Sequence, residues 1–200
     1  MNWFYLILIT VIGYFIFMCG RFVISSNKPF GIKYDASYNV APSELIPIKT
    51  KNFSKLMKWS YSPYWKKNMN LINCRSETIK EKPSFKNSKR CIIFHNGWYE
   101  WQRKDNEKIP YYHYSSSNNF AGLYNEIGCA ILTRNSTDSV NHIHHRQPVL
   151  LKNVEITRYL DGEDIFDSNA NYNIKFHQVR KDVNSPRNNY PNLIKSINFS

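Results

Sequence analysis

The chain has 200 residues, with 27 Lys and Arg against 15 Asp and Glu, and a formal net charge of +12 at pH 7. This length provides one domain with a sizeable core and is too short for two. The positive charge favours a polyanionic partner, either nucleic acid or an anionic membrane surface, although a balance that only keeps a protein soluble has the same sign. Four widely spaced cysteines without a CxxC pair disfavour a zinc site and a disulfide framework, and favour reduced thiols in an intracellular protein.

Residues 3–18 form an uncharged run of 16 mostly apolar residues. As a helix this run would span ~24 Å, which is short of the roughly 20 residues that a bilayer core requires. The start of the chain also lacks the basic segment of a signal peptide. Three interpretations stay open for residues 1–17: a membrane anchor, a removed leader, or an upstream extension of the true start site. We expect residues 18–200 to form one domain.

Cys19 follows a methionine, Met18. If translation starts at Met18 and that residue is removed, Cys19 carries a free α-amine beside its thiol. An α-amine has a reference pKa of ~7.7–8.0 against ~10.4 for lysine, so a larger fraction of it is unprotonated and nucleophilic at neutral pH. Such an aminothiol can condense with an aldehyde in a way that no internal cysteine can.

Beyond Phe22 the sequence predicts many short strands and few helices. Extended segments are expected at residues 38–42, 58–65, 90–94, 97–103, 110–114, 120–124, 129–133 and 148–152. A short helix is expected to start at Ser76 and another to cover residues 155–160, and Asn96-Gly97 predicts a hairpin between the strands on either side of it. This pattern is typical of an α+β, β-rich fold, built as a curved antiparallel sheet or a barrel.

The densest polar cluster is His142-Ile143-His144-His145-Arg146. No spacing elsewhere supplies the third and fourth ligands of a zinc site, so we expect no metal here. A basic surface loop explains the cluster more simply. A third interpretation uses one histidine as a general acid beside an arginine that binds phosphate.

Glu100 lies between aromatic residues, in Trp98-Tyr99-Glu100-Trp101. On an alternating strand Trp98 and Glu100 share one face. If that face is turned to the core, burial would raise the pKa of Glu100 into the range of a general acid or base, whereas on the solvent face Glu100 would lie near Arg103 or Lys104. The sequence favours neither orientation of Glu100. Asn73 and Arg75 could offer an amide and a guanidinium to a sugar or a phosphate, although each is more often structural.

These segments occur in the order and spacing of one family. In chain order they are Met18-Cys19-Gly20-Arg21-Phe22, Tyr38-Asn39-Val40-Ala41-Pro42, residues 59–65, Asn73-Cys74-Arg75-Ser76-Glu77-Thr78, Arg90-Cys91 with Gly97-Trp98-Tyr99-Glu100-Trp101, Ala121-Gly122-Leu123, Ile143-His144-His145-Arg146-Gln147-Pro148 and Val183-Asn184. From Met18 onward the chain resembles the SRAP (SOS response-associated peptidase) family, the abasic-site shielding proteins. The chain departs from the family pattern at Ser37, Lys66 and Gln147, and its segment between Phe22 and Tyr38 is short, so a helix common there is expected to be missing.

The resemblance implies a protein that binds single-stranded DNA in a basic groove and traps abasic sites covalently through an N-terminal cysteine. Carried over by position, the catalytic residues are Cys19, Asn73, Glu100 and His144. The DNA-binding positions are Arg21, Phe22, Asn39, Pro42, Trp65, Arg75 and Arg146. The resemblance implies no metal and no cofactor, and we expect a monomer that is intracellular and soluble, with a membrane contact only if residues 1–17 are retained.

The chemistry expected of such a site follows from the aldehyde of an open abasic sugar. The α-amine of Cys19 would form a Schiff base, and the thiol would close a thiazolidine that blocks strand cleavage. Glu100 would shuttle protons, His144 would protonate the sugar oxygen, and Asn73 would orient the amine or the sugar. The peptidase of the family name implies self-processing at the peptide bond before Cys19, with the same Cys and Glu.

Two alternatives differ in class from a covalent trap. The first is a non-covalent single-stranded nucleic-acid binding module that keeps the fold and has lost the crosslinking chemistry. The second is a membrane-anchored protein in which the domain is a passenger. An attached residue before Cys19 would favour the first, because an amide nitrogen cannot form the Schiff base.

Overall fold

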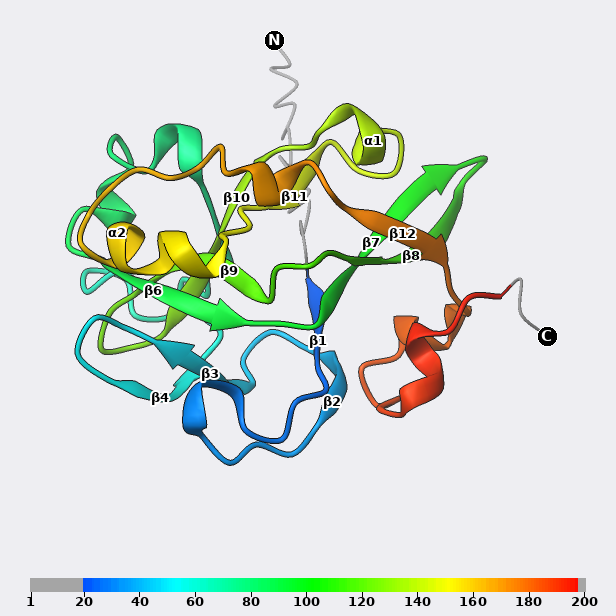
Figure 1. Ribbon diagram of the computed structural model, residues 1–200, viewed down its shortest axis with the longest axis horizontal. Helices are drawn as coiled ribbons and strands as arrows, with labels where there is room; N and C mark the ends of the chain where they lie inside the picture. Colours follow the sequence, from blue (N-terminus) through cyan, green and yellow to red (C-terminus); the bar gives the residue numbers. More distant parts are fainter. Residues whose placement is uncertain (1–19, 198–200) are drawn as a thin grey trace, which may run out of the picture.

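Two open β-sheets make up most of the computed structural model, which describes residues 20–197 (Figure 1). One sheet has the order β12 (Lys175–Gln178), β8 (Glu107–Tyr114), β7 (Gly97–Lys104), β1 (Arg21–Ile24) and β2 (Ser37–Val40). The other has the order β11 (Arg146–Pro148), β10 (Cys129–Asn135), β9 (Asn119–Tyr124), β6 (Lys89–Phe94), β3 (Leu45–Lys49) and β4 (Ser54–Lys58), and β5 (Asn73–Arg75) pairs with β10 in parallel.

The predicted β-rich class with few short helices is confirmed. The two α-helices of the described part are single turns, α1 (Asp138–Asn141) and α2 (Ile156–Leu160), and the remaining helical segments are 3₁₀ turns. The sequence left two forms open, a curved sheet and a barrel. The sheets within residues 20–197 stay open at both edges and do not close into a barrel. None of the helices in this range is long and apolar enough to cross a bilayer. The apolar run at residues 3–18 lies outside the described residues.

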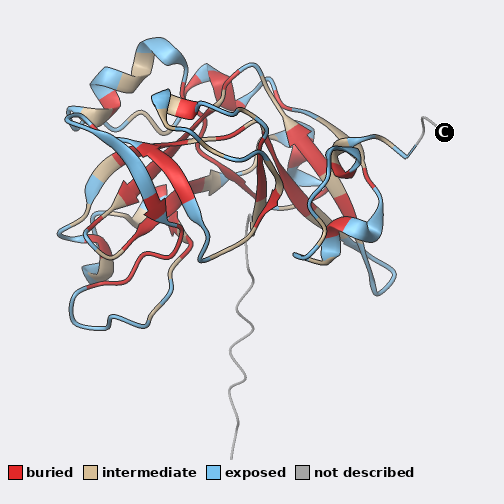
Figure 2. Ribbon diagram, turned by 90° about the horizontal axis from the view of Figure 1, so that it is seen from below, coloured by how far each residue is buried: buried red, intermediate tan, exposed pale blue. Residues whose placement is uncertain are grey.

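Aromatic side chains join the two sheets. Phe22 of β1 is fully buried and meets Trp59 and Phe120 edge to face, with ring centroids 4.9 and 5.9 Å apart. Trp98 of β7 meets Phe120 in the same way at 5.8 Å. Such pairs contribute about 0.5–1.5 kcal/mol each beyond the area that they bury. The core between the sheets therefore depends on β1 and β7. Figure 2 shows buried residues concentrated on the strands in the middle of the molecule.

The outer face of β7 is buried as well. Tyr99 is fully buried and packs with Tyr112 of β8 and with Val183 and Leu193 from the C-terminal segment. The amide of Asn39 ties this segment to β2, because its Nδ2 lies 3.0–3.2 Å from the carbonyl oxygens of residues 183, 185 and 188. A strand that is covered on both sides cannot show the simple inside–outside alternation of a surface strand.

The predicted hairpin at Asn96-Gly97 is wrong, because β6 and β7 belong to different sheets. A two-residue type I′ turn requires positive φ at both central residues, and neither Asn96 nor Gly97 has it. Gly97 instead makes room for Tyr112, whose hydroxyl would lie 2.3 Å from a Cβ at this position. The two-residue turn of the structure joins β7 to β8 at Asp105 (φ 49°) and Asn106 (φ 63°).

The strand predicted at residues 58–65 is also wrong, since β4 ends at Lys58. The chain bends at Ser60, whose N–H donates to the Lys58 carbonyl. This bend sends Trp59 into the core between the sheets and Tyr61 into a separate cluster around Phe85, so the aromatic alternation serves two cores rather than one strand. The strands predicted at residues 38–42, 90–94, 97–103, 110–114, 120–124 and 129–133 are confirmed with shifted ends, as is a short helix at 156–160. The strand predicted at 148–152 is wrong beyond Pro148, where β11 ends, and β1, β3, β4, β12 and α1 were not predicted.

Buried histidines make the stability of this core dependent on pH. His95 is fully buried and stacks on Phe120 at 3.6 Å, and neither ring nitrogen has a hydrogen-bond partner among the described residues. Burial lowers the pKa of His95 from 6.5 to about 3, and burial is also the main reason why the pKa of His113 is about 3. Between these pH values the unfolded chain binds protons that the folded chain does not, so stability is lost as the pH falls below 6.5.

We predict that His95→Phe removes one of these contributions. Phenylalanine keeps the stack on Phe120 and cannot take up a proton. The free energy of unfolding, measured by urea titration between pH 7.5 and pH 4.5, should fall less steeply than in the wild type by up to about 1.4 kcal/mol per pH unit. His145→Gln, at an exposed position, is the matched control and should leave the slope unchanged. An unchanged slope in His95→Phe would contradict the assignment.

Candidate functional site

The pairing of β1 with β7 places the start of the described chain beside Glu100. Arg21 lies opposite Tyr99 and Phe22 opposite Trp98 in an antiparallel register, so β1 starts beside the residue that precedes Glu100 on β7. Cys19, the predicted nucleophile, lies outside the described residues, but it is bonded to Gly20 at this end of β1. The site is therefore built at the N-terminal end of β1.

Glu100 lies on the buried face of β7, so the first of the two sequence alternatives is correct. Its side chain shares a face with Trp98, and the residue is only 3% exposed. It lines a cleft between the two sheets, and the other lining residues are Trp98, His113, Ser136, Val140, His144, Arg146 and Gln147. Within this cleft His144 Nδ1 lies 3.9 Å from Glu100 Oε2.

A short turn before β11 positions His144. Helix α1 anchors the turn through buried Val140, whose carbonyl accepts hydrogen bonds from the N–H groups of Ile143 and His144. The ring of His144 is fixed in turn by the backbone of Arg146, whose N–H and carbonyl lie 3.2 and 3.1 Å from Nδ1. If the Arg146 N–H donates to Nδ1, the neutral ring carries its proton on Nε2.

The electrostatic surroundings keep His144 neutral at pH 7. Burial lowers its pKa below 6.5, a hydrogen bond with the Arg146 carbonyl opposes this shift, and the positive charges of His145, Arg146 and Arg103 lower the pKa further. Once protonated, such a histidine is a stronger acid than an ordinary imidazolium, but its protonated form is scarce at neutral pH.

Arg146 is buried, at 5% exposure, and its charge is neutralised inside the protein. Its guanidinium forms a bidentate pair with Glu77, at 2.6 and 2.8 Å, and also donates to Asn135 Oδ1 and to the Thr133 carbonyl. Burial works against the ionised form of Glu77, but hydrogen bonds from Arg146 and from backbone N–H groups lower the pKa of this carboxyl to about 2. In this arrangement Arg146 connects β11 to the segment of Glu77. Its predicted DNA contact stays a prediction.

Asn73 comes from the second sheet, like His144. It starts β5, opposite Ile131 of β10, and is half-buried. The 3₁₀ turn Ser76–Thr78 follows β5 directly and carries Glu77 to Arg146. The structure thus brings Glu100 and His144 together directly, and it connects the segment of Asn73 to them through the Glu77–Arg146 pair.

The residues predicted to bind DNA differ in their exposure to solvent. Trp65 is 64% exposed and Arg75 is exposed, whereas Pro42 and Arg21 are half-buried. Phe22, Asn39 and Arg146 are buried. Phe22 packs in the core and Asn39 holds the C-terminal segment. The DNA contacts that the resemblance implies for these residues stay predictions.

Three polar residues of the cleft were not among the predicted site residues. His113 lines it from β8, opposite Trp98, and the two rings stack at 5.3 Å. Ser136 lies just beyond β10, and Gln147 accepts a hydrogen bond from the Thr137 N–H at 2.9 Å. The sequence does not give the register between β7 and β8. Without that register, His113 could not be assigned to the same face of the sheet as Trp98. Glu77 was part of a recognised motif, but its partner 69 residues away carries no local signal.

The remaining thiols are poor nucleophiles. Cys74, Cys91 and Cys129 are free and buried. Burial raises the pKa of Cys74 to about 12 and holds the pKa values of Cys91 and Cys129 well above the usual range for a thiol. Among residues 20–197 no group of three or more His, Cys, Asp and Glu side chains is arranged to hold a metal ion.

Glu100 and His144 thus face each other at the junction of the two open sheets, beside the first strand. The family model described as SOS response associated peptidase (SRAP) matches residues 18–186, and the chain belongs to this family. It is 34% identical to abasic site processing protein YoqW of Bacillus subtilis, over 90% of this chain and 100% of that protein. It is 29% identical to abasic site processing protein HMCES of Xenopus tropicalis, over 82% of this chain and 67% of that protein.

Solved structures share the fold. A protein from Bacteroides thetaiotaomicron superposes with a TM-score of 0.66 at 25% identity, over 80% of this chain and 85% of that one. A phage-related protein from Bordetella bronchiseptica gives a TM-score of 0.67 at 22% identity, over 82% and 95% of the two chains. The two-sheet architecture is therefore common to all three proteins.

The burial of the three thiols can be tested by alkylation. We predict that native protein treated with iodoacetamide at pH 7.5 leaves Cys74, Cys91 and Cys129 unmodified, because their thiolates are not formed, while protein unfolded in guanidinium is alkylated at all of them. Peptide mass spectrometry reads out each position. Native alkylation of any of the three at the rate of the unfolded chain would contradict their burial.

Proposed function

We propose that this protein binds single-stranded DNA and traps abasic sites covalently through Cys19. The observation that supports this most is the buried pair of Glu100 and His144 at the end of the strand that leads from Cys19. The relatives named abasic site processing proteins support the same substrate. The buried state of the other three thiols leaves Cys19 as the candidate nucleophile.

The first step is the attack of the Cys19 α-amine on the aldehyde carbon of the open abasic sugar. The amine proton passes to Glu100, and the same carboxyl then returns a proton to the departing hydroxyl, so that one water leaves and a Schiff base remains. The Cys19 thiol adds to the C=N bond, with its proton moving to nitrogen, and closes a five-membered thiazolidine. This ring removes the imine that would promote β-elimination and cleavage of the strand.

His144 serves the opening of the sugar ring. The closed form of an abasic sugar is a hemiacetal, and its ring oxygen must gain a proton when the ring opens. The protonated form of His144 is a stronger acid than an ordinary imidazolium because its pKa is lowered. In our proposal it donates this proton, while Glu100, 3.9 Å away, accepts a proton from the other side of the reaction.

Self-processing would use the same groups. When a residue precedes Cys19, the nitrogen of Cys19 is an amide and cannot form a Schiff base. We propose that the thiol attacks the carbonyl of Met18, that the amide nitrogen leaves as an amine after it takes a proton from Glu100, and that water hydrolyses the resulting thioester. The products are the free amine of Cys19 and a leader that ends in a carboxylate.

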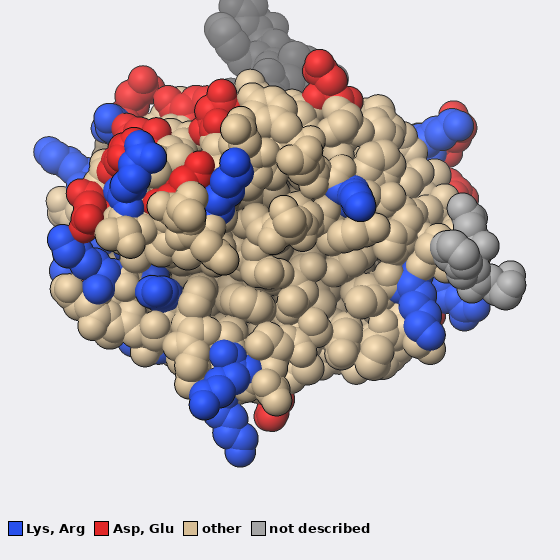
Figure 3. Space-filling model, in the orientation of Figure 1, with Lys and Arg blue, Asp and Glu red and all other residues tan. Residues whose placement is uncertain are grey.

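The charge distribution suits a single-stranded polyanion. In Figure 3 the acidic side chains on the visible face gather mainly around α2, where they mix with Lys and Arg. Many of these acids are engaged in ion pairs, such as Lys51–Asp161 at 2.7 Å and Lys80–Asp164 at 2.6 Å. The excess of basic residues over acidic ones is then available elsewhere for phosphates, and exposed Trp65 offers a stacking surface for a base.

We predict that protein starting at Cys19 forms an adduct with abasic single-stranded DNA that survives denaturing electrophoresis. Cys19→Ala should abolish it, and Glu100→Gln and His144→Gln should each slow its formation by about 10²–10⁴-fold, because each removes a proton donor or acceptor. Cys74→Ala, at a buried thiol, is the matched control. An adduct that survives Cys19→Ala would refute the mechanism, and salt-sensitive binding without any adduct would favour the non-covalent module.

We predict that Trp65→Ala weakens the binding of intact single-stranded DNA by about 1–3 kcal/mol, because it removes a stacking platform. Fluorescence anisotropy at fixed salt measures the affinity. Tyr172→Ala is the control, since Tyr172 is also exposed, at 51%, but lies against Arg134 on another segment. Equal losses in both variants would contradict a specific role of Trp65.

A further inference from the structure

Glu77 and Arg146 join two segments of the site that are far apart in the chain. Glu77 follows β5, the strand that begins with Asn73, and Arg146 follows His144 by two residues. Arg146 Nη1 lies 2.6 Å from Glu77 Oε1, and Nη2 lies 2.8 Å from Oε2. This two-point contact fixes both the distance and the orientation of the segments.

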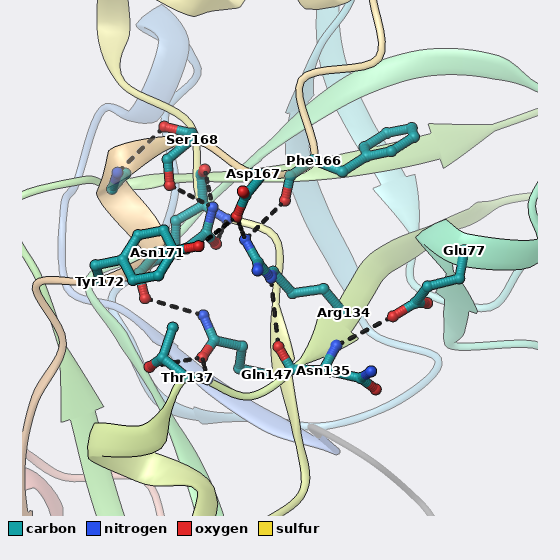
Figure 4. A network of polar contacts seen from close by, with 12 residues as sticks. Glu77, Arg134, Asn135, Thr137, Gln147, Phe166, Asp167, Ser168, Asn171 and Tyr172 are labelled. Atoms are coloured by element: carbon teal, nitrogen blue, oxygen red, sulfur yellow. Dashed lines mark hydrogen bonds and ion pairs between the residues drawn. The ribbon is translucent and has the colours of Figure 1, made fainter.

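The pair is supported on the side of Glu77 and on that of Arg146. Glu77 Oε1 accepts the backbone N–H of Asn135 at 3.1 Å, a contact drawn in Figure 4 at the edge of a network that continues through Arg134 to Asp167. Asn135 Oδ1 accepts from Arg146 Nη1 at 2.6 Å. Because Arg146 is buried, its charge requires a counter-ion, and Glu77 is the acid that forms an ion pair with it among the described residues.

The positive charge of Arg146 acts on the pKa of His144. The backbone N–H and carbonyl of Arg146 contact His144 Nδ1, and the positive side chain helps to lower the pKa of His144. The other charged or titratable groups that act on His144 are Glu100 and Arg103 from β7, His113 from β8, and neighbouring His145. The Arg146 charge that acts on His144 is paired with the carboxylate of Glu77.

We propose that Glu77 is a positioning residue of the crosslinking reaction: it holds Arg146, and through it the ring of His144 against Glu100, and it sets the charge that His144 faces. The inference rests on the proposed function for its catalytic meaning, but its structural and electrostatic content can be tested without any reaction.

The test compares wild type with Glu77→Gln, in protein that starts at Cys19. The imidazole signals of His144 are followed by NMR as the pH is varied. Loss of the negative charge leaves Arg146 uncompensated, so the pKa of His144 should fall by a few tenths of a unit to about one unit. Glu107→Gln, which removes an exposed carboxylate paired with Lys181 at 3.1 Å, is the matched control and should leave His144 unchanged. A folded Glu77→Gln with an unshifted His144 would overturn the proposal.

The second readout is the dependence of adduct formation on pH. In Glu77→Gln the part of the profile that follows His144 should move to lower pH by the same amount as the NMR titration. A residue with only a structural role would reduce the rate equally at every pH, and that result would overturn the proposal. If wild type forms no adduct, the proposed function fails, while the NMR titration still decides on Glu77.

A second pair of variants covers the case in which Glu77→Gln does not fold. Arg146→Gln removes the buried charge and leaves Glu77 partly exposed to water, with its side chain 42% accessible. The double variant Glu77→Gln/Arg146→Gln removes both charges and leaves two amides. The pKa of His144 should be lower in the double variant than in Arg146→Gln, and equal values would overturn the electrostatic role of Glu77.

Discussion

The packing of β1, a strand of one sheet, against the core that it shares with the other sheet is the constraint on which the site depends. Phe22 points into the core between the sheets, where it meets Trp59 and Phe120, and its strand pairs with β7 so that Arg21 lies opposite Tyr99. This arrangement places the N-terminal end of β1 at the seam where the two sheets face each other. Acid–base groups from both sheets can then reach one point, although neither sheet carries the whole set.

The same seam gathers polar atoms that lack hydrogen bonds within the described part of the chain. They include Trp98 Nε1, His113 Nδ1, Ser136 Oγ and Arg146 Nε, all from residues that line the cleft of Glu100. A buried polar atom without a partner costs about 1–3 kcal/mol of stability. Such a concentration at one place is typical of a site selected for chemistry at the expense of stability.

The sequence was sufficient for the fold class and for the positions of most strands along the chain. It could not decide which face of β7 holds Glu100, because Tyr99 on the opposite face is buried as well, under a C-terminal segment that no local pattern announces. The hairpin predicted at Asn96-Gly97 failed for a related reason. Gly97 is required by the close approach of Tyr112 and does not form a turn. Glu77 could be placed only after the partner of Arg146 was known, since pairing across 69 residues is a property of the tertiary structure.

The C-terminal segment has a consequence for the order in which the protein acquires its shape. Arg21 Nη1 donates to the Val183 carbonyl at 3.2 Å, across 162 positions of the chain, and Asn39 binds the same segment. Contacts between such distant residues form late, because a long loop must close first. During synthesis on the ribosome, β1 therefore stays without this brace until residues near 183 have emerged, so the contacts around β1 are complete only when nearly all of the domain has been made.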